Sequence, residues 1–269
     1  MPDYPKKIWQ TWKQPFLSLE TTEHENVQQW RDLNPEFEHH LLTDEDVAEY
    51  ISANFKEFPV WQENFGQLQD NILRADLFRY MVLFMEGGVY SDIDTKVLKE
   101  VDNWIPSAFK STSNIAIGIE MDQPEGKVWP GTSRFQLCQW TMMAKPKHWL
   151  LWSLIEGIFK RLRVLSEEQQ VHISAVSLSS AQVINITGPA AVTAEVFRYL
   201  THHLQRDVTG ADMTRHAGPQ LLHDVLILPV NAFGSGQPHS DSGEPSDDTA
   251  LVQHLFKGIW KENHIHESI

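Results

Sequence analysis

The sequence predicts a layered α/β fold, in one domain that spans residues 1–269. Apolar residues recur at helical spacing over 71–86, and Gly87 and Gly88 then lead into an apolar stretch at 89–93. A helix, a glycine turn and a buried strand within ~25 residues are typical of a layered α/β unit. The chain is 41% hydrophobic, and at this length it can bury roughly three quarters of its unfolded surface, which favours one large core.

Local patterns predict the elements that precede this unit. Alternating apolar and polar residues indicate an opening strand at 7–12. Thr43, with Asp46 three residues later, forms the pattern of a helix N-cap, and the helix is expected to run to about residue 54. Residues 57–70 contain Pro59 among large aromatic side chains and are expected to form helical turns and loop.

The second half of the chain is predicted to continue the alternation of strands and helices. Thr187, Gly188 and Pro189 open one helix, which runs to about residue 205, because proline fits the first helical position. Residues 234–248 are rich in Gly, Ser, Pro and Asp and predict a long loop, of the kind that often forms a functional lid. The other predicted elements are strands at 115–119 and 224–230, a last strand with a tail over 251–260, helices at 135–144 and 146–163, and loops at 104–114 and 122–133.

Charge and composition exclude several classes of protein. Lys and Arg number 22 against 36 Asp and Glu, which gives a formal charge of −14. Such an acidic chain lacks the electrostatic footprint of a general nucleic-acid binder. The single cysteine, Cys138, excludes an intrachain disulfide framework and a cysteine-based zinc site. No apolar run approaches the ~18 residues of a membrane span, so membrane contact is expected only through an anchor that this sequence does not contain.

Asp92-Ile93-Asp94 is the strongest candidate for chemistry. If the strand at 89–93 continues, its alternation places Tyr90, Asp92 and Asp94 on one face. Neighbouring carboxylates repel unless a cation or hydrogen-bond donors compensate them. Carboxylate oxygens suit hard divalent cations such as Mn²⁺ and Mg²⁺. A solvated or capping pair of aspartates is the alternative, because the D-x-D pattern also arises by chance in acidic chains.

A second pair of charges precedes this motif on the predicted helix 71–86. Asp76 and Arg79 are three residues apart and therefore share one helical face. A buried Asp or Arg on so apolar a helix destabilises the fold unless it has a partner. The two side chains are expected either to satisfy each other in an ion pair or to contact the hydroxyls of a sugar or a ribose.

Several segments resemble a known family. Residues 74–80 (Arg-Ala-Asp-Leu-Phe-Arg-Tyr) and 86–94 (Glu-Gly-Gly-Val-Tyr-Ser-Asp-Ile-Asp) resemble the sugar-binding DXD region of glycosyltransferase family thirty-two, and residues 5–13 resemble its first strand. Further segments resemble one branch, the fungal initiation-specific α-1,6-mannosyltransferases, in the same order along the chain. These segments are 134–146, 187–189, 228–234 and 254–261.

The resemblance implies a fold and an activity. The fold is of GT-A type, in which a Rossmann-like mixed sheet flanked by helices is joined to an acceptor-side half in the same domain. The activity is that of a retaining, metal-dependent hexosyltransferase, which moves mannose from GDP-mannose to a mannose-containing acceptor. Mn²⁺ is the usual ion and Mg²⁺ the alternative. The acceptor is an N-glycan core, and the family places such enzymes in the Golgi lumen on an N-terminal membrane anchor.

The resemblance also assigns roles around the donor nucleotide. Trp12, with Thr11 beside it, matches the tryptophan that stacks on the base. Tyr90 matches a tyrosine next to the ribose and base. Asp76 and Arg79 match residues near the donor sugar.

Three more residues receive roles in the same way. Asp92 matches the first DXD carboxylate, which contacts ribose, sugar or metal, and Asp94 matches the second, which binds metal. Trp260 matches a tryptophan that reaches the leaving diphosphate. The expected catalytic residues are Asp92, Asp94, Asp76 and Arg79.

The C-terminal segment departs from the family pattern of His-His-aromatic followed by Gly-Ser-Trp. Leu255 stands where a histidine is common and Ile259 where a serine is common. We expect His254 to be the third metal ligand, since a neutral imidazole suits Mn²⁺. Lys257 and Lys261 are expected to add positive charge near phosphate.

Two alternatives to this function remain open at the level of sequence. Because of Leu255 and Ile259, the chain is also compatible with a catalytically weak partner that binds sugar nucleotides, and another acceptor, such as a glycolipid, is a variant of the same activity. A hydrolase is less compatible, because Asp92 and Asp94 are too close in sequence to flank a glycosidic bond. The acceptor is expected to bind at the loops 122–133 and 234–248.

Overall fold

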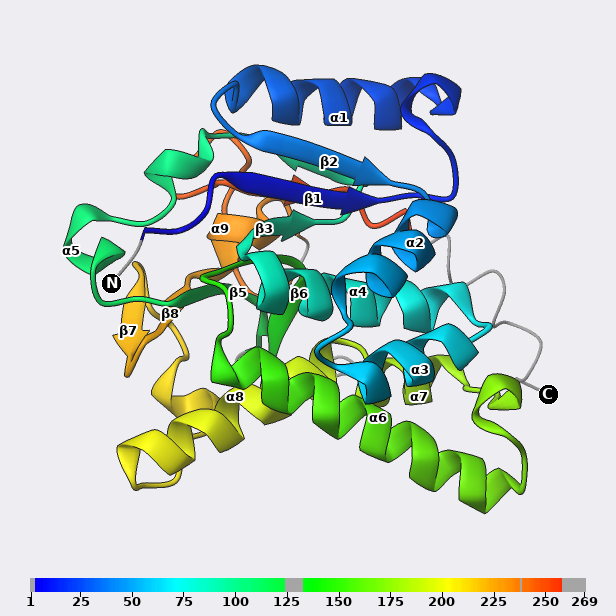
Figure 1. The fold of residues 1–269 in the computed structure, drawn as a ribbon. Coiled ribbons are helices and arrows are strands. Elements are labelled where there is room, and N and C mark those ends of the chain that lie inside the picture. The colour runs from blue at the N-terminus through cyan, green and yellow to red at the C-terminus, as the bar shows by residue number, and fades with distance from the viewer. Residues whose placement is uncertain (1–2, 124–132, 238, 258–269) are drawn as a thin grey trace.

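A seven-stranded mixed sheet between two layers of helices forms the frame of the computed structural model, which describes residues 3–123, 133–237 and 239–257 (Figure 1). The strand order is β2-β1-β3-β6-β5-β8-β7. β1 pairs in parallel with β2 and β3, and β5 with β8, while β6 and β7 run antiparallel to their neighbours. The predicted α/β sheet flanked by helices is thus confirmed. The strands are β1 Lys7–Thr11, β2 Glu38–Leu42, β3 Gly88–Ser91, β5 Ile115–Asp122, β6 Phe135–Ala144, β7 Gln220–Leu222 and β8 Val225–Leu228.

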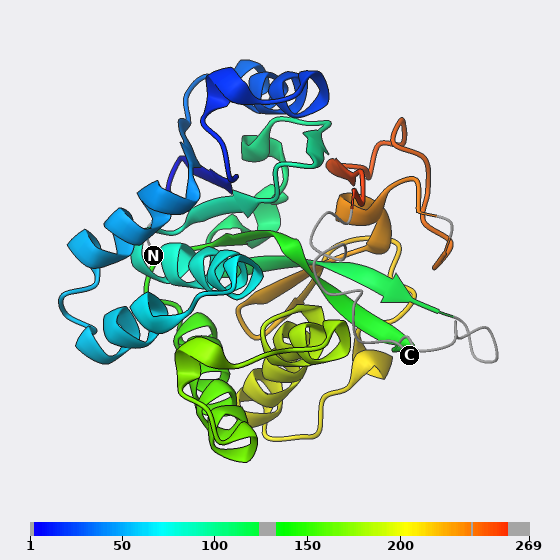
Figure 2. The ribbon, with the colours of Figure 1, turned by 90° about the vertical axis from the view of Figure 1, so that its right-hand side faces the viewer.

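The larger helical layer covers one face of the sheet. Figure 2 shows α6 and α8 on the same side as α4, with α1 on the opposite side. Alternate strand residues, including Trp9, Tyr90 and Ile117, enter the core beneath this layer. The helices are α2 Asp44–Asn54, α3 Pro59–Gln67, α4 Asn71–Glu86, α6 Trp149–Gln169, α7 Ser180–Ile186 and α8 Pro189–Leu204.

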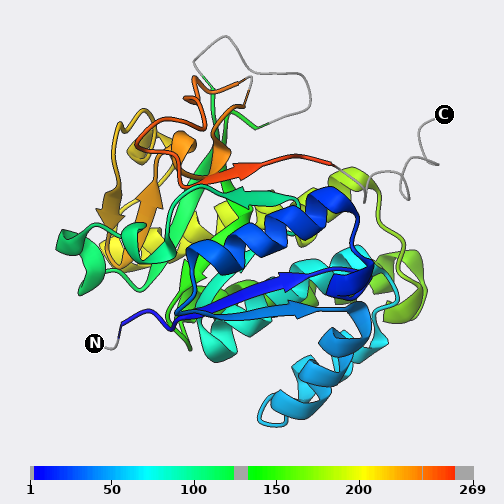
Figure 3. The same ribbon diagram turned by 90° about the horizontal axis from the view of Figure 1, so that it is seen from above.

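The opposite face has a second core around Trp30, Trp104 and Phe233. Its cover includes α1 Thr21–Leu33, α9 Val230–Gly234 and a two-stranded antiparallel sheet made by β4 Thr95–Val97 and β9 Val252–His254. In Figure 3, α1 crosses this face. β4 contacts α1 on one side and pairs with β9 (red) on the other. The short helices are α5 Ser107–Lys110, η1 Phe16–Ser18, η2 Val101–Asn103, η3 Ile173–Ala175 and η4 Gly210–Asp212.

Most of the predicted elements are confirmed. α4 has the predicted bounds, Thr43 and Asp46 form a reciprocal capping box at the start of α2, and Pro189 stands at the first position of α8. The turn glycines are required by the backbone. Gly87 and Gly88 have φ of 68° and 92°, and a side chain at Gly88 would meet the carbonyl oxygen of Lys7 at 2.4 Å.

The predicted helix at 135–144 is wrong, because this segment is strand β6 in the middle of the sheet. Its residues are apolar on both faces: Leu137 and Met142 enter one core, and Cys138 and Met143 the other. A strand buried on both sides has no alternation of polar residues, so periodicity alone does not distinguish it from a buried helix.

Other segments differ less from prediction. The helix α1 and strand β2 were not predicted, and α5 lies in the predicted loop 104–114. The loop expected at 122–133 lies mostly outside the described residues. Among the described residues, no helix combines the length and the apolarity needed to cross a bilayer.

Candidate active site

A cavity of about 740 Å³ opens at the carboxyl ends of β1 and β3. Ligands of α/β proteins commonly bind at this edge of a sheet. Eight of the nine predicted site residues line the cavity, and the ninth, Trp260, lies outside the described residues. The eight are Thr11, Trp12, Asp76, Arg79, Tyr90, Asp92, Asp94 and His254.

A tight turn, not an extended strand, holds the two DXD carboxylates. β3 ends at Ser91 and β4 begins at Thr95, so Asp92 and Asp94 lie in the turn between them. The Asp92 N–H donates to the carbonyl of Trp140 at 2.8 Å, and the Thr95 N–H donates to the carbonyl of Asp92 at 3.2 Å. The two carboxylates do lie close together, as predicted. The predicted cause, strand alternation, is wrong, because a turn and not a strand brings them together.

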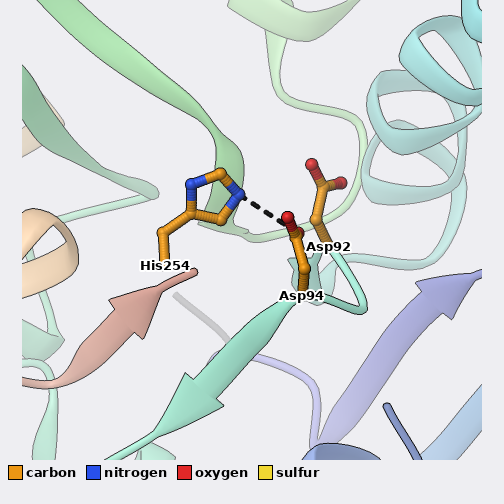
Figure 4. Close-up of side chains that lie close together, drawn as sticks. All are labelled: Asp92, Asp94 and His254. Atoms are coloured by element: carbon orange, nitrogen blue, oxygen red, sulfur yellow. Dashed lines mark hydrogen bonds and ion pairs between the residues drawn. The ribbon is translucent and has the colours of Figure 1, made fainter. Parts of the chain in front are cut away.

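Asp92, Asp94 and His254 form a candidate metal centre (Figure 4). Each offers one ligand atom, and these atoms all lie within 4.8 Å of one another. His254 stands at the end of β9 with its ring turned toward Asp94, and its Nε2 is 3.1 Å from Asp94 Oδ1. No other such group of three occurs in the part of the chain that the structure describes. Two carboxylates and an imidazole fit a divalent cation such as Mn²⁺.

Aromatic contacts fix the orientation of the His254 ring. It stacks on Trp140 from β6, with ring centroids 4.6 Å apart and an interplanar angle of 9°. Phe256 packs edge-on against the same ring at 3.9 Å. The Nδ1 atom of His254 is buried and has no hydrogen-bond partner among the described residues. Trp140 was not predicted as a site residue, because nothing in the local sequence shows that β6 passes beneath β9.

The segment after β9 also binds Asp94. The N–H of Leu255 donates to the Asp94 carbonyl at 2.9 Å, and the N–H of Lys257 donates to Asp94 Oδ2 at 3.1 Å. Burial raises the pKa of Asp94, but the hydrogen bonds from His254 and Lys257 outweigh it and hold that pKa below its ordinary value. The ammonium group of Lys257 pairs with buried Glu23 on α1. The expectation that this ammonium adds positive charge near phosphate stays a prediction, and Ile259 and Lys261 are outside the described residues.

Arg79 joins the metal-site carboxylates to the helix α4. Its Nη2 lies 3.0 Å from Asp92 Oδ1, its Nη1 lies 3.1 Å from Asp76 Oδ1, and its guanidinium carbon lies 5.1 Å from the centroid of the Tyr90 ring. The pair with Asp76 is close but poorly aligned, since Nη1 and Oδ1 have no hydrogen-bond partner among the described residues. Burial raises the pKa of Asp76 and of Asp92, and Arg79 opposes both shifts. The predicted ion pair is thus confirmed, and it includes a third group, Asp92.

Asp76 also contacts the start of α8. The hydroxyl of Thr187 donates to Asp76 Oδ2 at 2.7 Å, and Tyr80 donates to the carbonyl of Thr187 at 2.7 Å. Gly188 and Pro189 line the cavity. The segment 187–189, predicted only as a helix start, therefore forms one wall of the site.

The other wall of the site carries the residues expected to hold a nucleotide. Tyr90 is buried, which raises the pKa of its hydroxyl, and this hydroxyl lies 3.0 Å from the Thr11 hydroxyl. Trp12 follows β1, is half-buried and lines the cavity, with the Lys13 ammonium 5.5 Å from its ring. An indole face open to a cavity suits the stacking of a planar base.

Comparisons with known proteins show which proteins this chain resembles. Residues 20–110 match the family described as "Glycosyltransferase sugar-binding region containing DXD motif". Two proteins called initiation-specific alpha-1,6-mannosyltransferase match 97% of this chain. The one from Schizosaccharomyces pombe is 36% identical and the one from Candida albicans 32%. The chain spans 65% of the length of the first and 73% of the second.

Other proteins show weaker likenesses to this chain. Inositol phosphoceramide mannosyltransferase 3 of S. pombe is 32% identical, over 36% of this chain and 26% of its own. Among solved structures, the ligand-free glycosyltransferase domain from the YGT toxin covers 76% of this chain and 80% of its own, with a TM-score of 0.49 and 8% identity. The PaToxG glycosyltransferase covers 78% of this chain and 75% of its own, with a TM-score of 0.48 and 12% identity.

Proposed function

Because this chain belongs to the DXD-motif glycosyltransferase family that includes the initiation-specific α-1,6-mannosyltransferases, we propose that it is a retaining, metal-dependent mannosyltransferase. The donor is GDP-mannose, the acceptor is an N-glycan core, the linkage is α-1,6, and the site of action is the Golgi lumen. The observation that carries the proposal is the group of Asp92, Asp94 and His254 at the mouth of a cavity that also holds Arg79 and Trp12.

The cavity offers separate contacts for the parts of a nucleotide sugar. Trp12 and Tyr90 lie at the ends of β1 and β3, where the base and ribose would bind. Arg79 keeps Nε and Nη1 free of hydrogen bonds within the described part of the chain, and both atoms are shielded from solvent. Buried N–H groups without partners destabilise the fold, and hydroxyls of a bound sugar would satisfy them. Asp76 adds one acceptor atom, Oδ1, which is also shielded from solvent and has no hydrogen-bond partner among the described residues.

The chemistry requires a site that stabilises charge on a leaving diphosphate. Asp92, Asp94 and His254 would hold Mn²⁺ or Mg²⁺, and the bound ion would offset the negative charge that grows as the bond from sugar to phosphate breaks. Arg79 fixes Asp92 in place through the 3.0 Å contact. Retention follows when the acceptor hydroxyl attacks from the face that the diphosphate leaves, with a phosphate oxygen as the proton acceptor. No side chain is assigned as a base.

A glycolipid acceptor is the second candidate. Its support is the partial likeness to an inositol phosphoceramide mannosyltransferase, which covers 36% of this chain, whereas the α-1,6-mannosyltransferases cover 97%. The N-glycan acceptor is therefore favoured, because the likeness to its enzymes extends over the acceptor-side half of the chain.

The test is a panel of nucleotide sugars with Mn²⁺ and mannoside acceptors, with the linkage of the product determined by NMR and donor hydrolysis measured separately. We expect transfer from GDP-mannose and an α-1,6 product. Asp94→Asn removes one charge from the metal site and is expected to lower transfer at least a hundredfold with the fold intact, while Asp207→Asn, at an exposed position, leaves it unchanged. Binding of donor without transfer or hydrolysis would indicate the catalytically weak partner instead. Transfer by Asp94→Asn within a few-fold of wild type would refute the metal assignment.

A further inference from the structure

A second cavity, of about 580 Å³, opens at the same edge of the sheet as the donor cavity. Asp122 ends β5, and Pro229 and Val230 follow β8, so this cavity lies over the carboxyl ends of the parallel pair β5 and β8. Its outer wall is formed by described residues of the segment 240–249. None of the residues assigned to the donor site lines it.

The sheet order sets how far this cavity lies from the donor site. The donor cavity lies over β1 and β3, and β6 stands between β3 and β5. The two strand pairs are therefore three strand spacings apart, or about 14 Å at the usual spacing of neighbouring strands. The cavities adjoin along β5, because Glu120 lines the donor cavity while Ile119 and Asp122 line the second. This distance exceeds one sugar ring and suits a residue further along an acceptor chain.

The side chains around the second cavity include both donors and acceptors that have no partner among the described residues. Arg215, His216 and Asp241 are exposed. Their side chains form no hydrogen bond or ion pair with the described residues. The Asn231 Nδ2 donates to the Thr249 hydroxyl at 2.7 Å, while its Oδ1 is shielded from solvent and has no partner among these residues. A hydroxyl group both donates and accepts hydrogen bonds, so a mixed set of this kind suits a polyhydroxylated ligand.

The charges of this cavity disfavour two other kinds of ligand. Asp122, Asp241 and Asp247 face one Arg, which makes the cavity unsuitable for an anion. In the described part of the chain these carboxylates do not form a metal-binding group. Asp122 and Asp247 are already engaged, since Asp122 accepts from Thr214 and from the N–H of Arg215, and Asp247 accepts from the N–H of Glu244. A neutral ligand remains.

Asp122 forms hydrogen bonds with two segments that line the cavity. Its Oδ2 accepts from the Arg215 N–H at 2.6 Å, and its own N–H donates to the Ser240 hydroxyl at 2.9 Å. Arg215, Ser240 and Asp241 have φ of 56°, 63° and 51°, in the left-handed region that residues other than glycine rarely adopt. Strained backbone that is held by its surroundings is common at ligand sites.

We propose that this second cavity is an acceptor subsite, which binds a neutral sugar residue of an oligomannose acceptor at a position remote from the hydroxyl that reacts. The inference rests on the proposed function and adds a second binding site for the proposed acceptor. Arg215 donates to the sugar hydroxyls, and Asp241 and Asn231 accept from them. The subsite selects an oligomannose glycan over a single mannose, because only the former reaches both cavities.

Kinetics with two acceptors test the subsite. The acceptors are methyl α-mannoside and a branched oligomannose glycan released from an N-glycan. Asp241→Asn and Arg215→Gln are expected to raise KM for the glycan tenfold or more and to leave KM for the monosaccharide within twofold of wild type. The matched controls are Asp248→Asn, in the same segment with a fully exposed side chain, and Arg163→Gln, an exposed position on α6. Both controls are expected to leave both KM values unchanged.

Two outcomes would overturn the subsite: an unchanged KM for the glycan in both variants, or KM values that rise equally for the two acceptors. A wild-type chain that transfers mannose to neither acceptor would refute the proposed function alone. The subsite is then decided by NMR titration of the chain with the glycan in the absence of donor. Shift changes centred on 215–217 and 240–249 that Asp241→Asn abolishes support it, and their absence overturns it.

Discussion

Replacement of Arg79 is expected to destabilise the protein more than replacement of Asp76, although the two form one ion pair. Arg79 is 4% exposed and lies 3.1 Å from Asp76 and 3.0 Å from Asp92. Arg79→Gln leaves the buried carboxylate of Asp76 and the partly exposed carboxylate of Asp92 without their cation, and removal of one partner from a buried pair costs about 3–5 kcal/mol. Asp76→Asn leaves Arg79 paired with Asp92, and the new amide still accepts from Thr187, so the loss is about 1–2 kcal/mol.

The assay is thermal and urea unfolding of the purified variants. At roughly 2–4 °C per kcal/mol for a chain of this size, Arg79→Gln lowers Tm by about 10 °C and Asp76→Asn by about 4 °C. Arg74→Gln on the same helix is the control, because Arg74 is partly exposed, lies 5.4 Å from the centroid of the Phe65 ring, and forms no ion pair with the residues that the structure describes. We expect this control to change stability by about 1 kcal/mol or less.

The double variant separates shared from independent effects. In the Asp76→Asn background Arg79→Gln leaves one carboxylate unpaired instead of two, so the combined loss falls short of the sum by about 1–2 kcal/mol. Equal losses for the two single variants, or a strictly additive double variant, would refute the description of Arg79 as the cation shared by Asp76 and Asp92.

Three further predictions concern ligands and pH. GDP with Mn²⁺ is expected to raise Tm by about 5–10 °C at hundredfold excess over its Kd, since ligand binding then adds about 2.7 kcal/mol, and UDP raises it less; equal shifts would contradict a guanosine donor. His254→Ala is expected to raise the Mn²⁺ concentration for half-maximal transfer at least tenfold, and Leu255→His to change it less than threefold. A titration in which Leu255→His lowers this concentration and raises the rate, while His254→Ala has a mild effect, would move the ligand to position 255. Hydrogen bonds from His148 and Tyr199 outweigh burial and hold the pKa of Asp224 well below its ordinary value. The ionised carboxylate therefore stabilises the fold above about pH 4, and this contribution to the free energy of unfolding is lost as the pH falls below that value. Urea unfolding at several pH values should therefore show a steeper acid loss in wild type than in Asp224→Asn.

Local sequence patterns were sufficient to predict the first half of the donor site. The helical repeat over 71–86 placed Asp76 and Arg79 on one face, and the glycine turn carried the chain from that helix to Asp92. These relations depend on neighbours within about twenty residues, which propensity and periodicity describe. The segment 135–144, wrongly predicted as a helix, is a strand buried on both faces, so its side chains carry no periodic signal.

Long-range pairing determined the features that could not be predicted. His254 reaches Asp94 because β9 pairs with β4, which brings together residues 160 apart in sequence. Thr187 contacts Asp76 across 111 residues, and Lys257 contacts Glu23 across 234. Such contacts follow from the packing of whole elements, and no local pattern specifies them. The place of His254 was expected from family resemblance, whereas the stacking of its ring on Trp140 emerged only from the fold.

The most direct test of the account is a crystal structure of the chain with Mn²⁺ and GDP, with the ion located by its anomalous scattering. We predict one strong peak in contact with Asp92, Asp94 and His254, with the diphosphate beside it and the guanine base stacked on Trp12. A peak elsewhere on the molecule, or an ion in the cavity with His254 turned away from it, would contradict the assignment of this site as the metal centre of a mannosyltransferase.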